Sequence, residues 1–294
     1  MAQNNTTTPG ILVAVDGSAE SDAAVRWTAH EALMRKAPVT LMHVIAPMVV
    51  SWPIGDYQGS IMEWQEENAQ EVLEQAQKTL HATAGEAEVP IVHTEVVKAP
   101  VVPTLLEAAQ KAQMLVVGSR GMGAMGRAML GSVSAGVIHH AHGPVVVVHA
   151  DHAQAPDTTS PVVLGVDGSP ASEAATRLAF DEASRRGVDL VAVHAWSDVG
   201  VFPALGMDWH QYEAEGHEVL AERLAGWQEH YPDVHVRRRI VCDRPAHWLI
   251  EESEHAQLVV VGSHGRGGFT GMLLGSVSSA VAQSAKAPVI VVRP

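Results

Sequence analysis

Ile11-Leu-Val-Ala-Val-Asp-Gly-Ser18 is the stretch that decides the fold, because it returns later in the chain as Val162-Val-Leu-Gly-Val-Asp-Gly-Ser169. A second pair follows in the same order, since Leu115-Val-Val-Gly-Ser-Arg-Gly121 returns as Val259-Val-Val-Gly-Ser-His-Gly265. From Gly118 onward the two copies agree at ten of twenty positions, which is more than shared composition produces. The chain is therefore an internal duplication, and each copy is expected to fold as one unit.

The length of 294 residues suffices for two domains of ordinary size. We expect the first domain over residues 1–149, with a polar tail at residues 1–9, a linker over residues 150–160 and the second domain over residues 161–294. The spacing between equivalent positions falls from 151 residues at the repeated Asp to 144 at the repeated Gly, so the first copy carries seven extra residues. We place them in a loop over residues 48–60.

Short β-branched apolar runs alternate with longer segments of helical period in each copy. In the first copy this pattern predicts strands over residues 11–15, 39–45, 91–97, 114–117 and 144–148. Strands that alternate with helices are typical of an α/β fold whose parallel sheet is covered on both faces. Right-handed crossovers then favour two doubly wound domains, each with an open five-stranded sheet flanked by helices.

Composition narrows the range of partners. Lys and Arg number 19 against 33 Asp and Glu, which gives a net charge of -14. A protein with this negative net charge repels nucleic acid and anionic membrane surfaces, so neither is an expected partner. A single cysteine, no apolar leader and no apolar run of about 20 residues favour a cytoplasmic location.

Two repeated motifs follow strands whose carboxyl ends meet at the ligand crevice of a doubly wound sheet. Asp16 and Asp167 end the first strand of each copy, and a loop of spacing G-x2-G-x9-G-S follows the fourth. Glycine lets backbone N–H groups approach a phosphate, and a serine at a helix start can cap the helix or bind that phosphate. The alternative is a plain turn, in which the Asp-Gly-Ser segment only caps the next helix.

These motifs make each half similar to a universal stress protein domain, and the whole chain resembles the tandem universal stress proteins common in actinobacteria. The resemblance implies the ATP-binding branch of that family, strand order 3-2-1-4-5, and one ATP in each half. It further implies a regulatory nucleotide sensor in a stress, stationary-phase or dormancy response, a homodimer and an unidentified regulatory protein partner. It also suggests that the last strands of the two halves pair, within one chain or between two.

The resemblance carries the nucleotide contacts over to both copies. In the first copy they fall on Ala14, Val15, Asp16, Val44, Gly118, Ser119, Arg120, Gly121, Gly123, Gly131 and Ser132. In the second copy they fall on Gly165, Val166, Asp167, Ala195, Asp198, Gly262, Ser263, His264, Gly265, Arg266, Gly267, Gly275, Ser276 and Val277.

The two copies differ in charge and bulk. Arg266 is the basic residue typical of the loop, whereas the first copy has Met122 there and offers Arg120 and Arg127 nearby. Ala14 stands where the second copy has Gly165, which adds a methyl group near the expected base. The second site is therefore expected to bind at least as tightly as the first.

The histidines give weaker evidence of a functional site than the two repeated motifs. His43 and His194 recur in the second strand of each copy, and we interpret them as hydrogen-bonded core imidazoles. His139, His140 and His142 lack a carboxylate at helical spacing, so no metal site is predicted there.

Two other functions stay open. The first is a slow ATPase or phosphotransferase in which Asp16 or Asp167 holds Mg²⁺. The sequence has no P-loop motif with its phosphate-binding lysine, so we favour nucleotide binding over hydrolysis. No catalytic residue is assigned. The second is an interaction scaffold that binds no nucleotide. Replacing Gly118 or Gly262 by valine is expected to block one site and leave the fold intact.

Overall fold

The computed structural model describes residues 10–47, 58–87, 91–122, 129–150, 158–195, 209–265 and 273–294. The chain divides into two compact units. The first unit takes in residues 1–127, 131–137 and 148–153, and the second takes in residues 128–130, 138–147 and 154–294.

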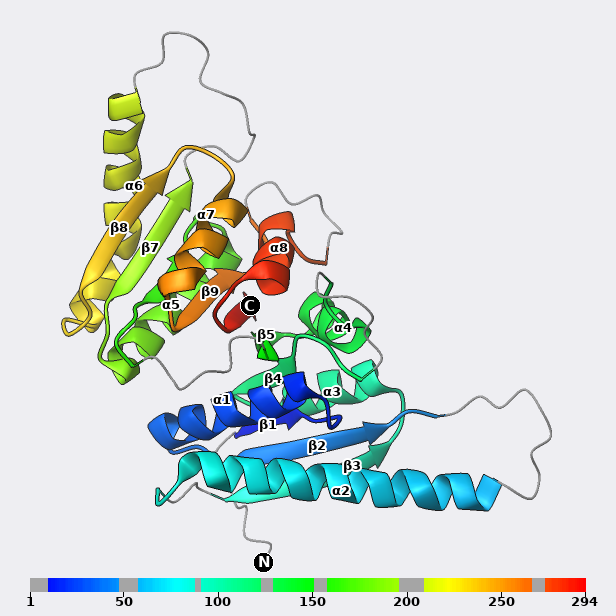
Figure 1. Cartoon of the computed structure of the whole chain (residues 1–294). Coiled ribbons are helices and arrows are strands. Elements are labelled where there is room, and N and C mark those ends of the chain that lie inside the picture. The colour runs from blue at the N-terminus through cyan, green and yellow to red at the C-terminus, as the bar shows by residue number, and fades with distance from the viewer. Residues whose placement is uncertain are drawn as a thin grey trace, which may run out of the picture. The chain divides into compact units, whose positions relative to one another are not determined.

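The first unit is built on a parallel sheet (Figure 1). Its strands are β1 (Ile11–Ala14), β2 (Val39–Ile45), β3 (Val92–Lys98) and β4 (Met114–Gly118), in the order β3-β2-β1-β4. Its helices are α1 (Ala19–Arg35), α2 (Gln58–Ala84), α3 (Val101–Ala109) and the first part of α4 (Ser132–His140). The predicted strand positions hold to within one residue.

The second unit repeats this plan and adds one strand from the first half of the chain (Figure 1). Its own strands are β6 (Val162–Gly165), β7 (Leu190–Ala195), β8 (Val236–Val241), β9 (Leu258–Gly262) and β10 (Val289–Arg293). Its helices are α5 (Pro170–Arg186), α6 (Trp209–His230), α7 (Pro245–Glu252), the 3-10 turn η3 (Ser253–His255) and α8 (Ser276–Ser284). The strand order β8-β7-β6-β9-β10 confirms the predicted order 3-2-1-4-5.

Strand β5 (Gly143–Val148) pairs with β10. The pairing is antiparallel, with Val289 opposite Val147 and Arg293 opposite Gly143. The suggested pairing of the two last strands therefore occurs within one chain, and residues 143–147 of β5 belong to the second unit.

The seven extra residues of the first copy do not lie where we placed them. Helices α2 and α6 start at equivalent positions, and α2 has 27 residues against 22 in α6. The connection after α2 covers residues 85–91, against residues 231–235 after α6. Residues 58–60 of the predicted loop belong to α2, and residues 48–57 lie outside the described ranges. The extra length therefore extends the helix and the connection that follows it.

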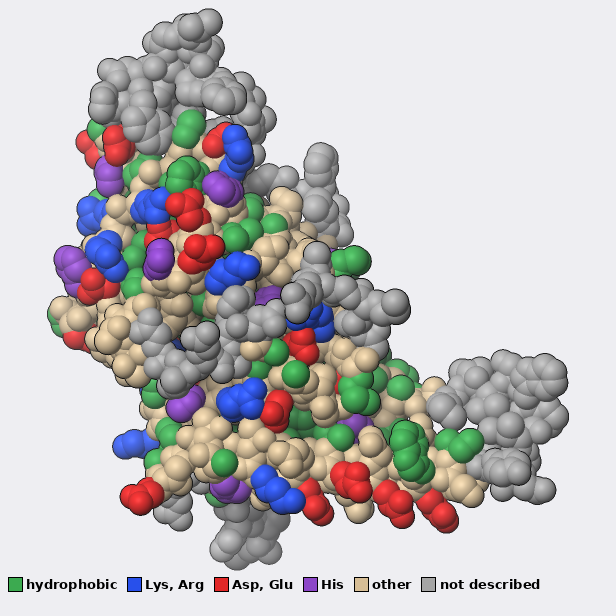
Figure 2. All heavy atoms as spheres, in the orientation of Figure 1, with side chains coloured by type: hydrophobic (Ala, Val, Ile, Leu, Met, Phe, Trp, Pro, Cys, Tyr) green, Lys and Arg blue, Asp and Glu red, His purple; other side chains and the backbone are tan. Residues whose placement is uncertain are grey.

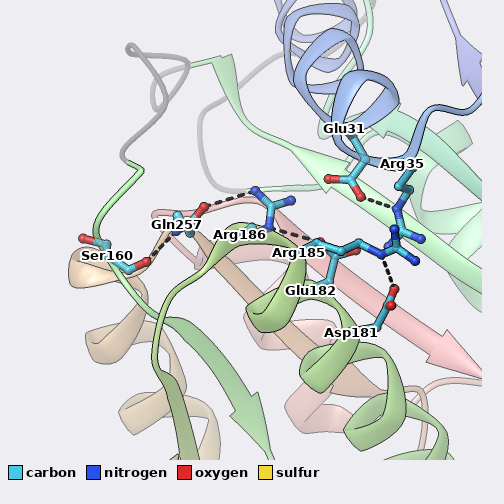
Figure 3. Close-up of polar contacts among 8 residues, drawn as sticks. All are labelled: Glu31, Arg35, Ser160, Asp181, Glu182, Arg185, Arg186 and Gln257. Carbon is cyan, nitrogen blue, oxygen red and sulfur yellow. Dashed lines mark hydrogen bonds and ion pairs between the residues drawn. The ribbon is translucent and has the colours of Figure 1, made fainter. Parts of the chain in front are cut away.

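Buried ion pairs recur at the carboxyl ends of the equivalent helices α1 and α5 (Figure 3). Glu31 pairs with Arg35, and Glu182 pairs with Arg186 at 3.1 Å; both Glu residues are fully buried. Arg186 also donates to the Gln257 side chain at 3.1 Å. Gln257 in turn donates to the Ser160 carbonyl at 2.6 Å, so this chain of contacts ties α5 to the segments that lead into β6 and β9.

Candidate nucleotide site

Asp16 follows the central strand β1 and joins three parts of the first unit. Its Oδ1 accepts the Ser18 amide at 3.0 Å and the Ser18 hydroxyl at 2.6 Å, while Ser18 caps α1 by accepting the Ser21 amide at 3.2 Å. Its Oδ2 accepts the Met122 amide from the loop after β4 at 3.3 Å. The Asp-Gly-Ser turn and cap of the simpler interpretation are therefore present, and the same carboxylate also reaches the glycine-rich loop.

Asp167 occupies the equivalent place in the second unit. Its Oδ1 accepts the Ser169 amide at 2.9 Å, and its own amide donates to the Ser172 hydroxyl at 3.1 Å. Ser169 differs from Ser18, because its hydroxyl donates to the His264 carbonyl at 2.9 Å rather than to the aspartate. The contact between the α5 cap and the loop after β9 thus runs through the serine.

The second glycine of each loop lies against the aspartate. A Cβ on Gly121 would stand 2.5 Å from Asp16 Oδ2, and one on Gly265 would stand 2.6 Å from Asp167 Oδ2. Neither glycine is among those with positive φ, so the contact with the carboxylate, and not backbone strain, explains the absence of a side chain. The structure therefore brings the two predicted motifs together in both units.

Backbone hydrogen bonds close each loop at its ends. The Gly131 amide donates to the Ser119 carbonyl at 2.8 Å, and the Gly275 amide donates to the Ser263 carbonyl at 2.8 Å. Ser276 follows directly as the first residue of α8, whose N-cap is Gly275 and makes no side-chain cap bond. Ser132 and Ser276 are both exposed, and each is the first residue of a helix. Unpaired N–H groups at a helix start favour an anion there.

Ser119 is a buried polar residue whose hydroxyl is unsatisfied in the described part of the chain. Its side chain is 1% exposed, and its Oγ has no hydrogen-bond partner among the described residues. Its counterpart Ser263 is fully buried, and its Oγ lies 3.0 Å from His264 Nδ1. A buried hydroxyl without a partner is costly, so the Ser119 Oγ is a position that a bound phosphate or ribose oxygen would satisfy.

The glycines that open the loops have a packing role that the sequence analysis missed. A Cβ on Gly118 would stand 2.6 Å from the backbone of Glu20 in α1, and one on Gly262 would stand 2.6 Å from the backbone of Ala171 in α5. Valine at either position would force strand and helix apart. The expectation that such a variant keeps its fold is therefore wrong.

A side chain at Gly165 would face the core and not the crevice. A Cβ at this position would meet Leu249 Cδ1 at 3.2 Å and Val261 Cγ1 at 3.4 Å, which are core side chains. Ala14 holds the equivalent position in β1 and is half-buried, so the placing of its methyl group near a base stays a prediction.

Two further residue pairs were missed. Ser134 and Ser278 are buried, and their hydroxyls donate to the carbonyls of Gly118 and Gly262 at 2.6 and 2.5 Å, which fixes the start of each loop. Both serines are among the ten shared positions, so the repeat itself carried that signal. Arg120 pairs with Glu20 at 2.8 Å, and their side chains are only 14% and 15% exposed. The charge of Arg120 is therefore partly neutralised by Glu20 of α1.

His43 and His194 are both hydrogen-bonded, as interpreted, but only His194 is buried in the core, whereas His43 is half-buried. His43 Nδ1 lies 2.8 Å from the Val15 carbonyl, and His194 Nδ1 lies 2.7 Å from the Val166 carbonyl. Each ring thus holds the end of the central strand just before the aspartate. The next residues in sequence, Val44 and Ala195, are half-buried near the ends of β2 and β7.

The remaining predicted contacts divide by location. Val277 lies in the first turn of α8 and is half-buried. Gly123, Asp198, Arg266 and Gly267 lie outside the described residues. No group of three His, Cys, Asp or Glu that could hold a metal ion occurs within the described ranges, nor does any described helix combine the length and apolar character needed to cross a membrane.

Comparison with known proteins places this geometry in a family. The model of the universal stress protein family matches residues 9–149 and again residues 158–293. The chain belongs to the universal stress protein family. As a tandem universal stress protein it is 64% identical over 285 residues to a universal stress protein of Mycolicibacterium smegmatis, with 97% of each chain covered.

A second relative and a solved structure belong to the same family. A universal stress protein of Mycobacterium tuberculosis is 52% identical over 285 residues, again with 97% of each chain covered. The crystal structure of a universal stress protein from Archaeoglobus fulgidus covers 97% of this chain and 98% of its own, with a TM-score of 0.73 and 21% identity. At that identity the structural likeness shows the fold alone.

Proposed function

We propose that this universal stress protein binds one adenine nucleotide in each unit, with ATP as the natural ligand, and acts as a regulatory binding protein. The observation that carries the proposal is the contact of the G-x2-G-x9-G-S loop with the aspartate after the central strand, which occurs in both units. Main-chain donors of the loop and of the following helix would hold the phosphates, as the local field there favours an anion despite the net charge of -14.

The polar side chains supply the rest of the site. Asp16 and Asp167 would accept from ribose or base groups, and Ser119 would donate to a ligand oxygen. Mg²⁺ would have one protein carboxylate in each site and would depend on the nucleotide phosphates for its other ligands. A bound triphosphate stabilises the form that binds it, so a partner protein that distinguishes the two forms would respond to ATP concentration.

Slow ATP hydrolysis is the second candidate, because a carboxylate lies beside the phosphate loop in each unit. Binding is preferred, since Asp16 is already engaged by Ser18 and Met122 and Arg120 is engaged by Glu20. The cytoplasmic location, the homodimer and the role in stress or dormancy belong to the same proposal, and the family resemblance supports them.

The decisive experiment counts the nucleotides that the protein holds. Denaturing the freshly purified chain and analysing the supernatant by mass spectrometry identifies any adenine nucleotide, and calorimetry with ATP gives the stoichiometry. We expect two sites per chain. Release of ADP at steady state that is lost in the loop variants below would instead favour the ATPase.

Matched alanine variants assign each site. In Gly121→Ala and Gly265→Ala the new Cβ displaces the carboxylate of Asp16 or Asp167, a flexible side-chain end, so the fold should survive. Each variant should lose at least about tenfold in affinity at one site, which corresponds to about 1.4 kcal/mol. Gly226→Ala is the control, because its new Cβ would meet no atom within 4 Å apart from its chain neighbours and the backbone of its own helix. Two unchanged sites in the double variant would overturn the assignment.

A further inference from the structure

A cavity of about 170 Å³ lies in the first unit, between the start of α1 and the middle of α2. Val25 and Ala76 are buried at its apolar side, and Ser18 and Ser21 contribute hydroxyls. Asp22 is the one ionisable side chain in its lining. The remaining lining residues are Val15, Gly17, Ala19, Val72 and Gln75. Its volume is comparable to that of an engineered cavity of about 150 Å³ that takes up benzene.

The second unit fills the equivalent space with its own side chains. A Cβ on Gly17 would meet Val72 at 3.1 Å, whereas one on Gly168 would collide with the guanidinium of Arg223, so Val72 and Arg223 hold the same place. One turn further along α6, Trp227 stands where α2 has Ala76, and it stacks on Phe180 at a centroid distance of 6.2 Å. The smaller residues of α2 therefore leave room that Arg223 and Trp227 occupy in α6.

The comparison of the two units indicates which chemical group the cavity of the first unit could hold. The location beside the first turn of the helix accepts a guanidinium in the second unit, although the positive end of the helix dipole disfavours a cation there. The first unit keeps the polar side of the location, with Ser18, Ser21 and the acidic Asp22. It lacks the cation and the planar ring, since Val72 and Ala76 replace them.

Asp22 can take a further donor. Its Oδ2 accepts from Arg26 at 2.8 Å and its Oδ1 accepts from Thr79 at 3.0 Å. A carboxylate has about four lone-pair sites, so two existing partners leave room for an N–H of a ligand. These two contacts also fix the rotamer of Asp22, because one comes from α1 and the other from α2.

The surroundings favour the approach of a cation. Five exposed glutamates lie along α2, and acidic side chains gather over this helix in Figure 2. They are Glu63, Glu66, Glu67, Glu71 and Glu74. Glu71 and Glu74 directly precede the lining residues Val72 and Gln75 in sequence. Lys98 pairs with Glu66 and Lys78 lies on the same helix, so the surface keeps an excess of negative charge, which raises the local concentration of small cations.

We propose that this cavity binds a small guanidinium or amidinium compound. Its planar cation takes the place that Arg223 holds in the second unit, with an N–H group donating to Asp22. Its short apolar part lies on Val25, Val72 and Ala76. The cavity shares Val15 with the expected nucleotide contacts, and it exists in the first unit because α2 carries small residues where α6 carries large ones.

Methylguanidinium and its neutral analogue N-methylurea are the probes. Calorimetric titration of the full chain should show one methylguanidinium site, with N-methylurea at least about tenfold weaker, a difference of about 1.4 kcal/mol. Equal affinity for the two probes, or no binding of either, would overturn the proposal. An arginine side chain carries the same cation, so agmatine is compared with a capped arginine amide; tighter binding of agmatine identifies a free small molecule as the ligand, and tighter binding of the amide identifies an arginine of another chain.

Reciprocal substitutions locate the site. Val72→Arg with Ala76→Trp transfers the filling of the second unit to the first, and should abolish methylguanidinium binding. Arg223→Val with Trp227→Ala opens the second unit, and should raise the stoichiometry from one to two. Should either variant fail to fold, crystals of the unsubstituted chain soaked in methylguanidinium decide: density beside Asp22 supports the proposal, and an empty cavity at saturating probe overturns it.

Discussion

At the scale of single residues, one aspartate links a helix cap to the glycine-rich loop. Asp16 anchors the α1 cap through Oδ1 and meets the loop through Oδ2, so one side chain sets the distance between them. The sequence predicted this pairing, because both motifs follow neighbouring parallel strands. It could not predict that Gly118 is required by the backbone of Glu20, since the approach of α1 to β4 depends on packing between distant segments.

Ser119→Ala separates the structural role of this residue from its binding role. The hydroxyl is buried without a partner, so its removal should leave the free energy of unfolding unchanged or raise it by up to about 1 kcal/mol. Affinity for ATP at the first site should fall severalfold. Ser263→Ala is the matched variant, and it should cost about 1 kcal/mol because it removes the contact with His264. Urea unfolding and calorimetry measure both effects, and a strongly destabilised Ser119→Ala would contradict this account.

At the scale of helices and strands, periodicity located the elements but not the length difference between the copies. Leu73, Ala76 and Leu80 follow a helical period in the sequence, and all three are buried in α2. The five residues by which α2 exceeds α6 were assigned to a loop instead. An exposed helix can gain a turn without any change in the core, so the hydrophobic pattern carries no record of it.

Two glycines of α6 should respond in opposite ways to alanine. Gly226→Ala places a methyl group in open space within the helix, and should raise the free energy of unfolding by about 0.5–1 kcal/mol. Gly216→Ala places a Cβ 2.8 Å from Ile240 Cγ2 of β8, and should destabilise the protein by about 1–3 kcal/mol. Thermal and urea unfolding of both variants measure the contrast. Equal effects would mean that α6 does not pack on β8 as described.

The last turn of α4 should make stability depend on pH. Burial, and then the charges of His140 and Arg293, lower the pKa of His139 below its ordinary value of 6.5. The folded state therefore binds this proton less readily than the unfolded state, so the contribution to stability is present above about pH 6.5 and is lost as the pH falls through the lowered pKa. His139→Gln should lose less stability than the unsubstituted protein between pH 7.5 and pH 5.5 in urea unfolding. The same loss in both proteins would remove His139 from this account.

At the scale of the whole molecule, the two copies do not divide the chain at the linker alone. The duplication predicted two domains with equivalent strands, and the sheet orders agree with it. It could not show that residues 143–147 join the second unit, because β5 reads as the last strand of its own half and its pairing with β10 joins segments more than 140 residues apart. The pairing itself was expected only from the family resemblance, because contacts over such a separation leave no local trace in the sequence.

Weakening the core of the second unit should reveal which unit β5 follows. Phe180 is fully buried between Trp227 and Tyr231, with ring centroids 6.2 and 5.7 Å away, so Phe180→Ala should destabilise that unit by about 3–5 kcal/mol. Hydrogen exchange followed by mass spectrometry should then show faster exchange in β6, β9 and β10, with β1 and β2 nearly unchanged. The peptide that covers residues 143–147 should accelerate with β10, because five register pairs join them. If that peptide keeps the protection of β1 instead, the pairing with β10 does not govern its stability.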